Sequence, residues 1–129
     1  MSQSSSNNLP KIITSSFVVN SGHLNARDVL SLCKILETIT SLKDEAIVQI
    51  LGSLDFSKVL LEHFYLDFIE QANLHDVVTF QSYVSMTAED LVEISITVNK
   101  KKGKWNVPIV NGSFVFTMKA GIEVNYSLS

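Results

Sequence analysis

Apolar and polar residues alternate most regularly between residues 91 and 99. Every second side chain there is apolar, and those between are mostly polar: Val92, Ile94, Ile96 and Val98 alternate with Leu91, Glu93, Ser95, Thr97 and Asn99. A period of two predicts a β-strand with one buried face and one largely wet face. Residues 77–87 alternate in the same way, with Val78, Phe80, Ser82, Val84 and Met86 on one face. The turn residues at 88–90 predict a hairpin between the two strands.

Three further segments have the composition of strands. Residues 11–19, 55–69 and 107–120 are rich in β-branched and aromatic side chains, and residues 122–128 are a candidate for a short terminal strand. Within the last long strand, Asn111-Gly112 predicts a bulge or bend. The basic run from Lys100 to Lys104 predicts a hairpin tip, which is either a solvated turn that discourages edge pairing or a contact for phosphate groups.

A helical period replaces the strand pattern between residues 26 and 41. Asn25 is a favourable N-cap, and Asp28 puts a negative charge in the first turn. Apolar side chains form a broad arc around the helix, against a narrow polar strip: the arc is Val29, Leu30, Leu32, Cys33, Ile35, Leu36 and Ile39, and the strip is Arg27, Ser31, Lys34 and Thr38. So broad an arc predicts a core helix. Residues 44–53 predict a second, short helix that stops at Gly52.

Glu37 falls inside the apolar arc, between Cys33 and Leu30 on a helical wheel. A carboxylate there is costly unless it is paired, protonated or facing a cleft. Two interpretations stay open. Glu37 either lies near the helix end and reaches water, or is a functional carboxylate whose pKa is raised by apolar surroundings.

Length and composition restrict the class of protein. The 129 residues suit one domain, residues 11–129, preceded by a polar tail at residues 1–10. With 46% hydrophobic and 18% charged residues the chain is not a disordered one, and the net charge of −3 gives no general attraction to nucleic acid or to an anionic membrane. We expect neither a spanning segment of about 20 apolar residues nor a signal peptide. The single cysteine, Cys33, permits no internal disulfide, which fits a cytoplasmic location.

The predicted order is one strand, a buried helix, a short helix and four long antiparallel strands. This order predicts a single α+β domain in which a curled sheet wraps around one long helix. No internal repeat or linker divides the chain.

Two regions of the sequence resemble the hotdog-fold acyl-CoA thioesterases. Gly22-His23-Leu24-Asn25 and the following VLSLCKILE are similar to the start of the central helix, and to the helix itself, in the 4-hydroxybenzoyl-CoA branch. The segment His63-Phe64-Tyr65-Leu66-Asp67-Phe68, with His75-Asp76-Val77-Val78 after it, resembles V-D-x-x-D-F followed by G-D-x-V in the acyl-CoA hydrolase branch. Residues 111–120 resemble the last strand of that branch.

The resemblance implies a hotdog fold with a curled antiparallel sheet of about five to six strands around one long central helix. It implies hydrolysis of an acyl-CoA or acyl-carrier thioester, with coenzyme A as part of the substrate and no other cofactor. It also implies a homodimer or a dimer of dimers, in which helices lie side by side, sheets join at their edges and the thioester binds at the interface. Coenzyme A phosphates would then meet Arg27 or the basic run at 100–104.

The sequence departs from the family at several functional positions. Ala26-Arg27 stand where a pair of glycines is usual, and Lys34 stands where one branch has an acidic residue. The aspartate of the other branch is replaced by Val19, with Asn20 beside it. Neither catalytic carboxylate of the family is therefore in register.

Thioester hydrolysis requires a base for the attacking water and donors for the oxyanion. The predicted helix start supplies backbone N–H donors around residues 25–28. The catalytic candidates are Glu37, Asn25, His23 and Asn20, and the substrate-binding candidates are Gly22, Ala26, Arg27 and Lys34. The alternatives are that Asn25 is only a cap and His23 only a loop residue. His63 and His75 show no ligand spacing with Cys33, so no metal site is predicted.

These observations predict an acyl-CoA thioesterase that acts at a dimer interface. The displaced carboxylates favour an alternative from another class, a hotdog module that binds acyl groups or acyl-CoA without hydrolysing them. A purely structural, partner-binding domain is a third interpretation. We expect the protein to bind another copy of itself and an acyl-CoA ligand, and neither nucleic acid nor membrane.

Overall fold

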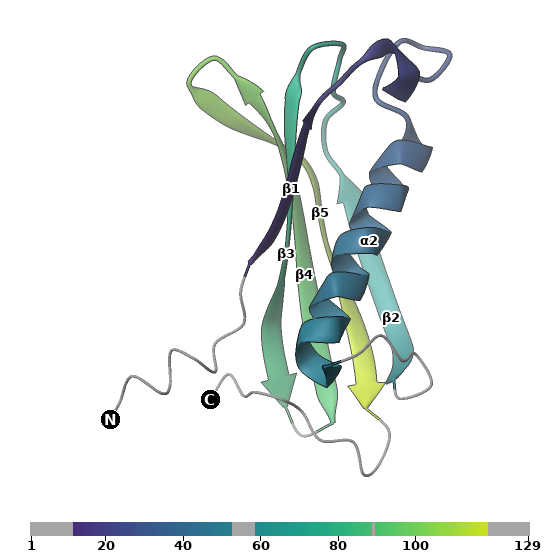
Figure 1. Ribbon diagram of the computed structural model, residues 1–129, viewed down its shortest axis with the longest axis vertical. Helices are drawn as coiled ribbons and strands as arrows, with labels where there is room; N and C mark the ends of the chain where they lie inside the picture. Colours follow the sequence, from purple (N-terminus) through teal and green to yellow (C-terminus); the bar gives the residue numbers. More distant parts are fainter. Residues whose placement is uncertain (1–11, 53–58, 89, 119–129) are drawn as a thin grey trace.

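The computed structural model describes residues 12–52, 59–88 and 90–118, and its main element is an antiparallel sheet (Figure 1). Its strands are β1 (Ile13–Val18), β2 (Val59–Phe68), β3 (Val77–Ala88), β4 (Leu91–Lys102) and β5 (Trp105–Met118). Within the described residues the sheet has five strands in the order β1-β3-β4-β5-β2. The long strands predicted from alternation and composition are therefore confirmed, whereas the predicted tail and the terminal strand at 122–128 lie outside the described residues.

The inner face of the sheet follows the alternation in the sequence. Val92, Ile94, Ile96 and Val98 of β4 are buried, and so are Val78, Phe80, Ser82 and Val84 of β3. Met86 has the same parity but is 40% exposed. The pairing of β3 with β4 shifts register between Val84 and Met86, so the alternation changes sides at that point.

The hairpin between β4 and β5 is longer than the sequence indicated. β4 continues to Lys102, and the turn residues are Gly103 and Lys104, with φ of 63° at Gly103. A positive φ at the first turn position suits a two-residue hairpin and favours glycine. Lys100 is 5% exposed, so the predicted basic tip is wrong for this lysine. The exposed tip consists of residues 101–105.

Asn111-Gly112 does not form the predicted bulge. Gly112 pairs in register with both Ile96 and Leu66. The register shift between β4 and β5 instead falls between Val98 and Asn99. Gly112 serves close packing, because a Cβ there would collide with the Tyr65 carbonyl oxygen and lie 2.6 Å from Leu66 Cδ2.

One continuous helix, α2 (Leu32–Leu51), replaces the two predicted helices. It begins at Leu32 and not at residue 26, with Ser31 as the N-cap, whose Oγ accepts from the Lys34 N–H at 3.1 Å. Asn25 is therefore not the N-cap. The residues before the helix form a looped segment instead, in which Leu24 bridges Leu30 and Asp28 has a φ of 62°. The predicted helix stop at Gly52 is confirmed, and Gly52 has the left-handed conformation typical of a helix end.

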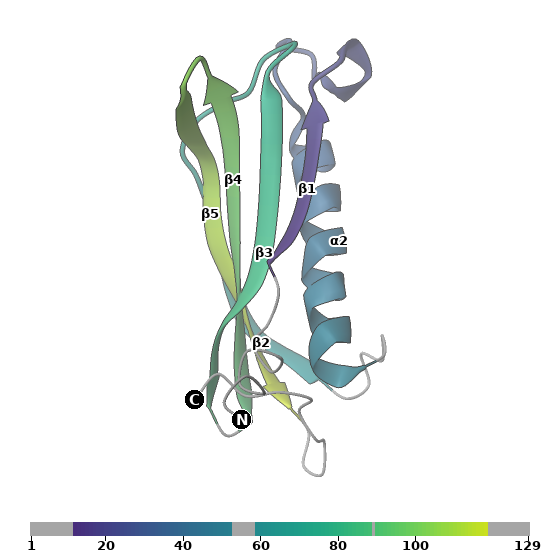
Figure 2. The ribbon, with the colours of Figure 1, turned by 60° about the vertical axis from the view of Figure 1, so that its left-hand side comes forward.

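α2 packs on the inner face of the sheet, chiefly over β1, β3 and β4 (Figures 1 and 2). Its buried side chains are Ile35, Ile39, Leu42, Ala46, Ile47 and Ile50. The predicted apolar arc is only partly covered, since Leu32 is 53% exposed, Leu36 is 37% exposed and Cys33 is exposed. The sheet of the single chain therefore does not bury the whole apolar arc of the helix, as the predicted core helix would require. No helix within the described residues has the length and apolarity needed to cross a membrane.

Candidate functional site

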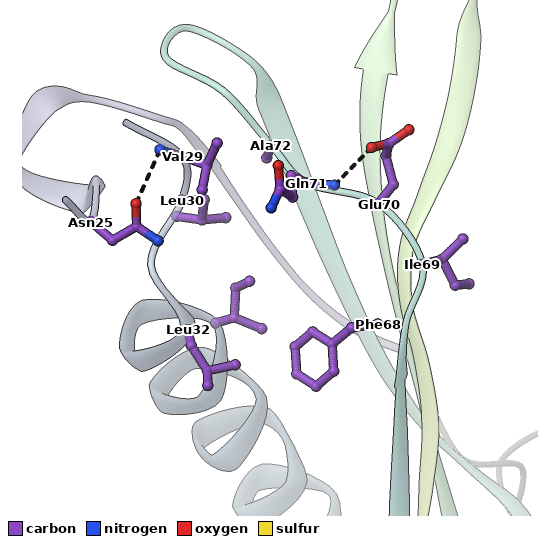
Figure 3. Close-up of a pocket in the computed structure, with 10 residues that line it drawn as sticks. Asn25, Val29, Leu30, Leu32, Phe68, Ile69, Glu70, Gln71 and Ala72 are labelled. Carbon is purple, nitrogen blue, oxygen red and sulfur yellow. Dashed lines mark hydrogen bonds between the residues drawn. The ribbon is translucent and has the colours of Figure 1, made fainter. Parts of the chain in front are cut away.

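A cavity of about 480 Å³ opens between the beginning of α2 and the end of β2. Two segments that are distant in sequence line it: Asn25, Val29, Leu30, Leu32 and Ile35 on the helix side, and Phe68, Ile69, Glu70, Gln71 and Ala72 on the strand side. Figure 3 shows Asn25 and Leu32 facing Gln71 and Phe68 across this space. Seven of the ten lining residues are apolar, and Asn25, Glu70 and Gln71 add amide and carboxylate groups.

Backbone hydrogen bonds join the two walls. The Leu30 N–H donates to the Ala72 carbonyl at 2.8 Å, and Val29 forms a β-bridge with Asn73. At the end of β2, the Ile69 N–H donates to the Ile109 carbonyl at 2.7 Å. Backbone hydrogen bonds therefore fix the two walls relative to each other and to the sheet.

Asn25 closes the loop before α2 with its side chain. Its Oδ1 accepts from the Arg27 N–H at 2.8 Å and from the Val29 N–H at 3.3 Å. These two backbone donors fix the orientation of the amide, so Nδ2 is the free end. Figure 3 shows this nitrogen on the side of the cavity. Asn25 is thus both a loop-closing residue and the one predicted catalytic candidate that lines the cavity.

The backbone donors predicted at residues 25–28 are largely engaged within the loop. The Asn25 N–H donates to the Val29 carbonyl at 2.9 Å, and the Asp28 N–H donates to the Asn25 carbonyl at 3.0 Å. The helix start at Leu32 has unengaged donors instead. In the described part of the chain, the N–H groups of Leu32 and Cys33 donate no hydrogen bond to protein, and they lie at the positive end of α2.

Asn20 and His23 form a local capping box that does not reach the cavity lining. The Asn20 N–H donates to His23 Nδ1 at 3.1 Å, and Asn20 Oδ1 accepts from the Gly22 N–H at 2.9 Å. The His23 ring also packs against Phe17, with ring centroids 4.8 Å apart. Nδ1 is an acceptor here, so Nε2 carries the proton of the neutral ring. This geometry suits the loop-residue interpretation of His23.

Glu37 lies outside the cavity lining. Its side chain is 75% exposed, and its carboxylate is 3.6 Å from the ammonium of Lys34. Lys34 Nζ also sits 5.3 Å from the centre of the Phe17 ring. In the single chain Glu37 therefore reaches water, on the same exposed helix surface as Cys33 and Leu36. Ala26 and Arg27 are exposed in the loop before α2.

Sequence reasoning missed the strand side of the cavity. Glu70 and Gln71 lie between the two family-like segments at residues 63–68 and 75–78 and belong to neither. The pairing of this loop with Leu30 brings them to the helix start. Glu70 Oε1 accepts from the Gln71 N–H at 3.0 Å, and its side chain points away from the cavity in Figure 3. Within residues 12–52, 59–88 and 90–118, no group of three or more His, Cys, Asp or Glu side chains could hold a metal ion.

Solved structures of acyl-CoA thioesterases have the same fold as this chain. An acyl-CoA hydrolase from Staphylococcus aureus, in complex with butyryl coenzyme A, coenzyme A and coenzyme A disulfide, has 11% identity and a TM-score of 0.71, and the match covers 88% of this chain and 71% of that one. A hexameric acyl-CoA thioesterase has 12% identity and a TM-score of 0.72, with coverage of 88% and 76%.

A third structure represents the other branch named in the sequence analysis. It is a variant of 4-hydroxybenzoyl-CoA thioesterase complexed with 4-hydroxybenzoyl-CoA, with 9% identity, a TM-score of 0.66, and coverage of 88% of this chain and 90% of that one. Comparison of the sequence with family models and with curated proteins found no match. At these identities the likeness establishes the fold. In the part of the chain that the structure describes, one long helix packs against a curled five-stranded antiparallel sheet, the hotdog fold of the acyl-CoA thioesterases.

Proposed function

We propose that this protein hydrolyses an acyl-CoA or acyl-carrier thioester in the cavity at the start of α2. The observation that carries the proposal is a pair of cavity-lining residues with unengaged donors among the described residues: Leu32 has its backbone N–H and Asn25 has its Nδ2. The N–H of Cys33 follows at the same helix start and is also unengaged. Backbone donors at a helix start favour the negative charge that develops on a thioester oxygen. The coenzyme A complexes of proteins with this fold support the choice of substrate.

The lining suits an acyl group next to that oxygen. Leu30 and Ile35 are buried, and Leu32 and Phe68 are partly exposed toward the opening. Apolar side chains in a pocket bind an apolar chain, and the polar groups among them fix the position of its polar head. The thioester carbonyl would then lie at the helix start, with the acyl chain among these side chains.

Glu37 is the proposed base, acting from a second protomer. Within its own chain its carboxylate lies outside the cavity. A partner helix lying beside α2 would cover the exposed surface formed by Leu36 and Cys33, which includes Glu37. In the reaction the carboxylate takes a proton from water, the water oxygen attacks the carbonyl carbon, and the thiolate leaves and is protonated.

The dimer itself is proposed from the exposed apolar surface. β2 is an edge strand, and six of its side chains or immediate neighbours are large, apolar and at least 40% exposed: Leu60, Leu61, Phe64, Tyr65, Phe68 and Ile69. A long apolar edge is a liability in a monomer, and pairing it with the same edge of a second copy removes the unpaired backbone groups. β5 lies between β4 and β2, so it offers no free edge to a second sheet.

The part of the substrate that carries the sulfur, coenzyme A or an acyl-carrier domain, would lie outside the cavity, near the basic residues. Arg27 and the hairpin lysines Lys101, Lys102 and Lys104 are exposed and can meet phosphates, whereas Lys100 is buried. Both coenzyme A and an acyl-carrier domain present a phosphate to such groups. We place the reaction in the cytoplasm, where the exposed thiol of Cys33 stays reduced.

The decisive experiment is a turnover assay over a panel of acyl-CoA esters of increasing chain length, with Asn25→Asp as the matched variant. Asn25→Asp keeps the acceptor for the Arg27 and Val29 N–H groups but removes the Nδ2 donor. We expect measurable hydrolysis that falls by about 100-fold or more in this variant, the usual effect of one oxyanion donor. No hydrolysis of any ester by a folded dimer would exclude the proposed enzyme.

A second function, binding without hydrolysis, is favoured by a specific observation. Of the predicted catalytic residues only Asn25 lines the cavity, and the one carboxylate there, Glu70, points away from it. A protein of this kind would be stabilised against heat by acyl-CoA esters and would return them unchanged. Thermal stabilisation together with no release of free thiol selects this alternative.

A further inference from the structure

A lysine interrupts the apolar row on the inner face of β4. Val92, Ile94, Ile96 and Val98 occupy the preceding inward positions, and Lys100 occupies the next one. Its Cα partners across the sheet are Val78 and Val107, and it is 5% exposed. An ammonium at such a position is costly unless its protons are used.

Both polar partners of Lys100 belong to the loop after β2. Its Nζ donates to the carbonyl oxygen of Gln71 and lies 3.9 Å from Asp76 Oδ2. The same Asp76 oxygen accepts from the Asn73 N–H at 2.8 Å. The single buried cation therefore holds the beginning and the end of this loop together.

The loop that Lys100 holds is a wall of the cavity. Gln71 and Ala72 line it, and the Ala72 carbonyl accepts from Leu30 on the opposite wall. The carbonyl of Gln71 thus binds to the sheet, while the carbonyl of Ala72 binds to the segment before α2. Lys100 itself does not line the cavity, so it acts on a ligand only through this wall.

We propose that Lys100 is a positioning residue that holds the Gln71–Ala72 wall, and that ligand affinity depends on it beyond its effect on folding. An apolar side chain of similar length would fill the same place in the sheet, because the surrounding inner face is apolar. What such a side chain cannot do is bind the Gln71 carbonyl and the Asp76 carboxylate. The proposal rests on the proposed function only in taking the cavity as the thioester site.

The test compares Lys100→Met with Ser82→Ala as a matched control. Ser82 is also buried on the inner face, and its Oγ donates to the Leu42 carbonyl at 3.2 Å, away from the cavity lining. Each substitution thus removes one buried hydrogen bond to a carbonyl. Amide hydrogen exchange at Leu30 reports the wall directly, since its N–H donates to the Ala72 carbonyl, and exchange at Asn73 reports the rest of the loop, since its N–H donates to Asp76. The affinity for butyryl-CoA, by calorimetry, reports the site.

Lys100→Met is expected to speed exchange at Leu30 and Asn73 by about tenfold or more relative to the β4 amides. The affinity for butyryl-CoA is expected to fall separately by about tenfold, the loss that corresponds to a wall in its binding position a tenth of the time. Lys100→Arg, which keeps the charge and the donors, should recover part of both effects. Ser82→Ala should lower the melting temperature. It should not speed exchange at Leu30 and Asn73 relative to the β4 amides, and it should not change the affinity for butyryl-CoA.

The proposal is overturned if exchange at Leu30 and Asn73 rises no more in Lys100→Met than in Ser82→Ala. This holds whatever the affinity for butyryl-CoA is. If the parent protein binds no butyryl-CoA, the proposed function loses its support, and hydrogen exchange still decides the role of Lys100. Should Lys100→Met fail to fold, Asp76→Asn replaces it, since the amide oxygen still accepts from Asn73 but no longer attracts the ammonium. In that variant Leu30 alone is the readout, because Asn73 donates to the substituted side chain. The same selective rise in exchange at Leu30 is expected, and its absence overturns the proposal.

Discussion

The backbone N–H of Leu30 donates to the carbonyl oxygen of Ala72 at 2.8 Å, and this bond joins the loop before α2 to the loop after β2. One partner lies just ahead of the helix start and the other follows an edge strand, so the bond joins the two segments that line the cavity. It also explains why Leu30 is not helical although it belongs to an apolar helical pattern: its N–H is used in a long-range contact.

Substitutions of Asn25 should separate its loop-closing role from its role as a donor. Asn25→Ala removes the acceptor for the Arg27 and Val29 N–H groups, so the free energy of unfolding should fall by about 1 kcal/mol. Asn25→Asp keeps that acceptor and should lose little stability while losing turnover. Chemical denaturation and thiol-release assays on both variants provide the comparison. Equal turnover in Asn25→Asp and the parent would remove the donor from the mechanism.

Replacing Glu37 by glutamine should leave folding unchanged and reduce turnover. The Lys34–Glu37 pair is exposed, and such pairs stabilise by less than about 1 kcal/mol. If Glu37 is the base, the rate should fall by about 100-fold or more. Glu70→Gln is the matched control, since Glu70 is the carboxylate that lines the cavity. A large loss in Glu70→Gln and none in Glu37→Gln would reassign the base.

Mixing two inactive variants tests whether the base comes from a second protomer. Glu37→Gln and Asn25→Asp proteins, unfolded together and refolded, should regain about a quarter of the parental turnover, because half of the dimers are mixed and each has one intact site. Each variant refolded alone is the control. Turnover that stays at the level of the separate variants would mean that Glu37 and Asn25 act within one chain.

Light scattering should give a mass of at least twice the 14.3 kDa of one chain. Leu60→Lys puts a charge on the β2 edge, where Leu60 is 58% exposed, and should shift the equilibrium toward the monomer. Trp105→Lys changes a side chain that is 75% exposed on the distant β4–β5 hairpin and should leave the mass unchanged. A parent protein that is monomeric at micromolar concentration contradicts both the dimer and the interfacial base.

Gly112→Ala should destabilise the fold without touching the cavity. A Cβ at this position would collide with the Tyr65 carbonyl and crowd Leu66, both on the neighbouring strand β2. Overpacking of this kind costs about 1–3 kcal/mol. Gly103→Ala is the control, because a Cβ there meets nothing within 4 Å and only the φ of 63° opposes it. Thermal unfolding should show the larger loss for Gly112→Ala, and equal losses would contradict the close approach of β2.

The sequence by itself determined the inner face of the central strands. Burial of Val92, Ile94, Ile96 and Val98 follows from a strict period of two, since neighbouring side chains of a strand point to opposite faces. The stop at Gly52 is equally local, because glycine adopts the left-handed conformation that ends a helix without a steric penalty. Such features depend on residues close together in the chain, and for that reason a pattern can reveal them.

Only the tertiary structure decided where α2 begins, what Lys100 does and which residues form the cavity. Asn25 has the chemistry of an N-cap, but the bond from Leu30 to Ala72 and the bridge of Val29 to Asn73 hold that segment in a loop, so the helix starts at Leu32. The sequence places Lys100 in a solvated basic run. In the structure the loop after β2 supplies a carbonyl and a carboxylate for its ammonium, so Lys100 is buried. Each of these outcomes is a contact between segments far apart in sequence, and the free energy of such a contact is not encoded in the local pattern of either segment.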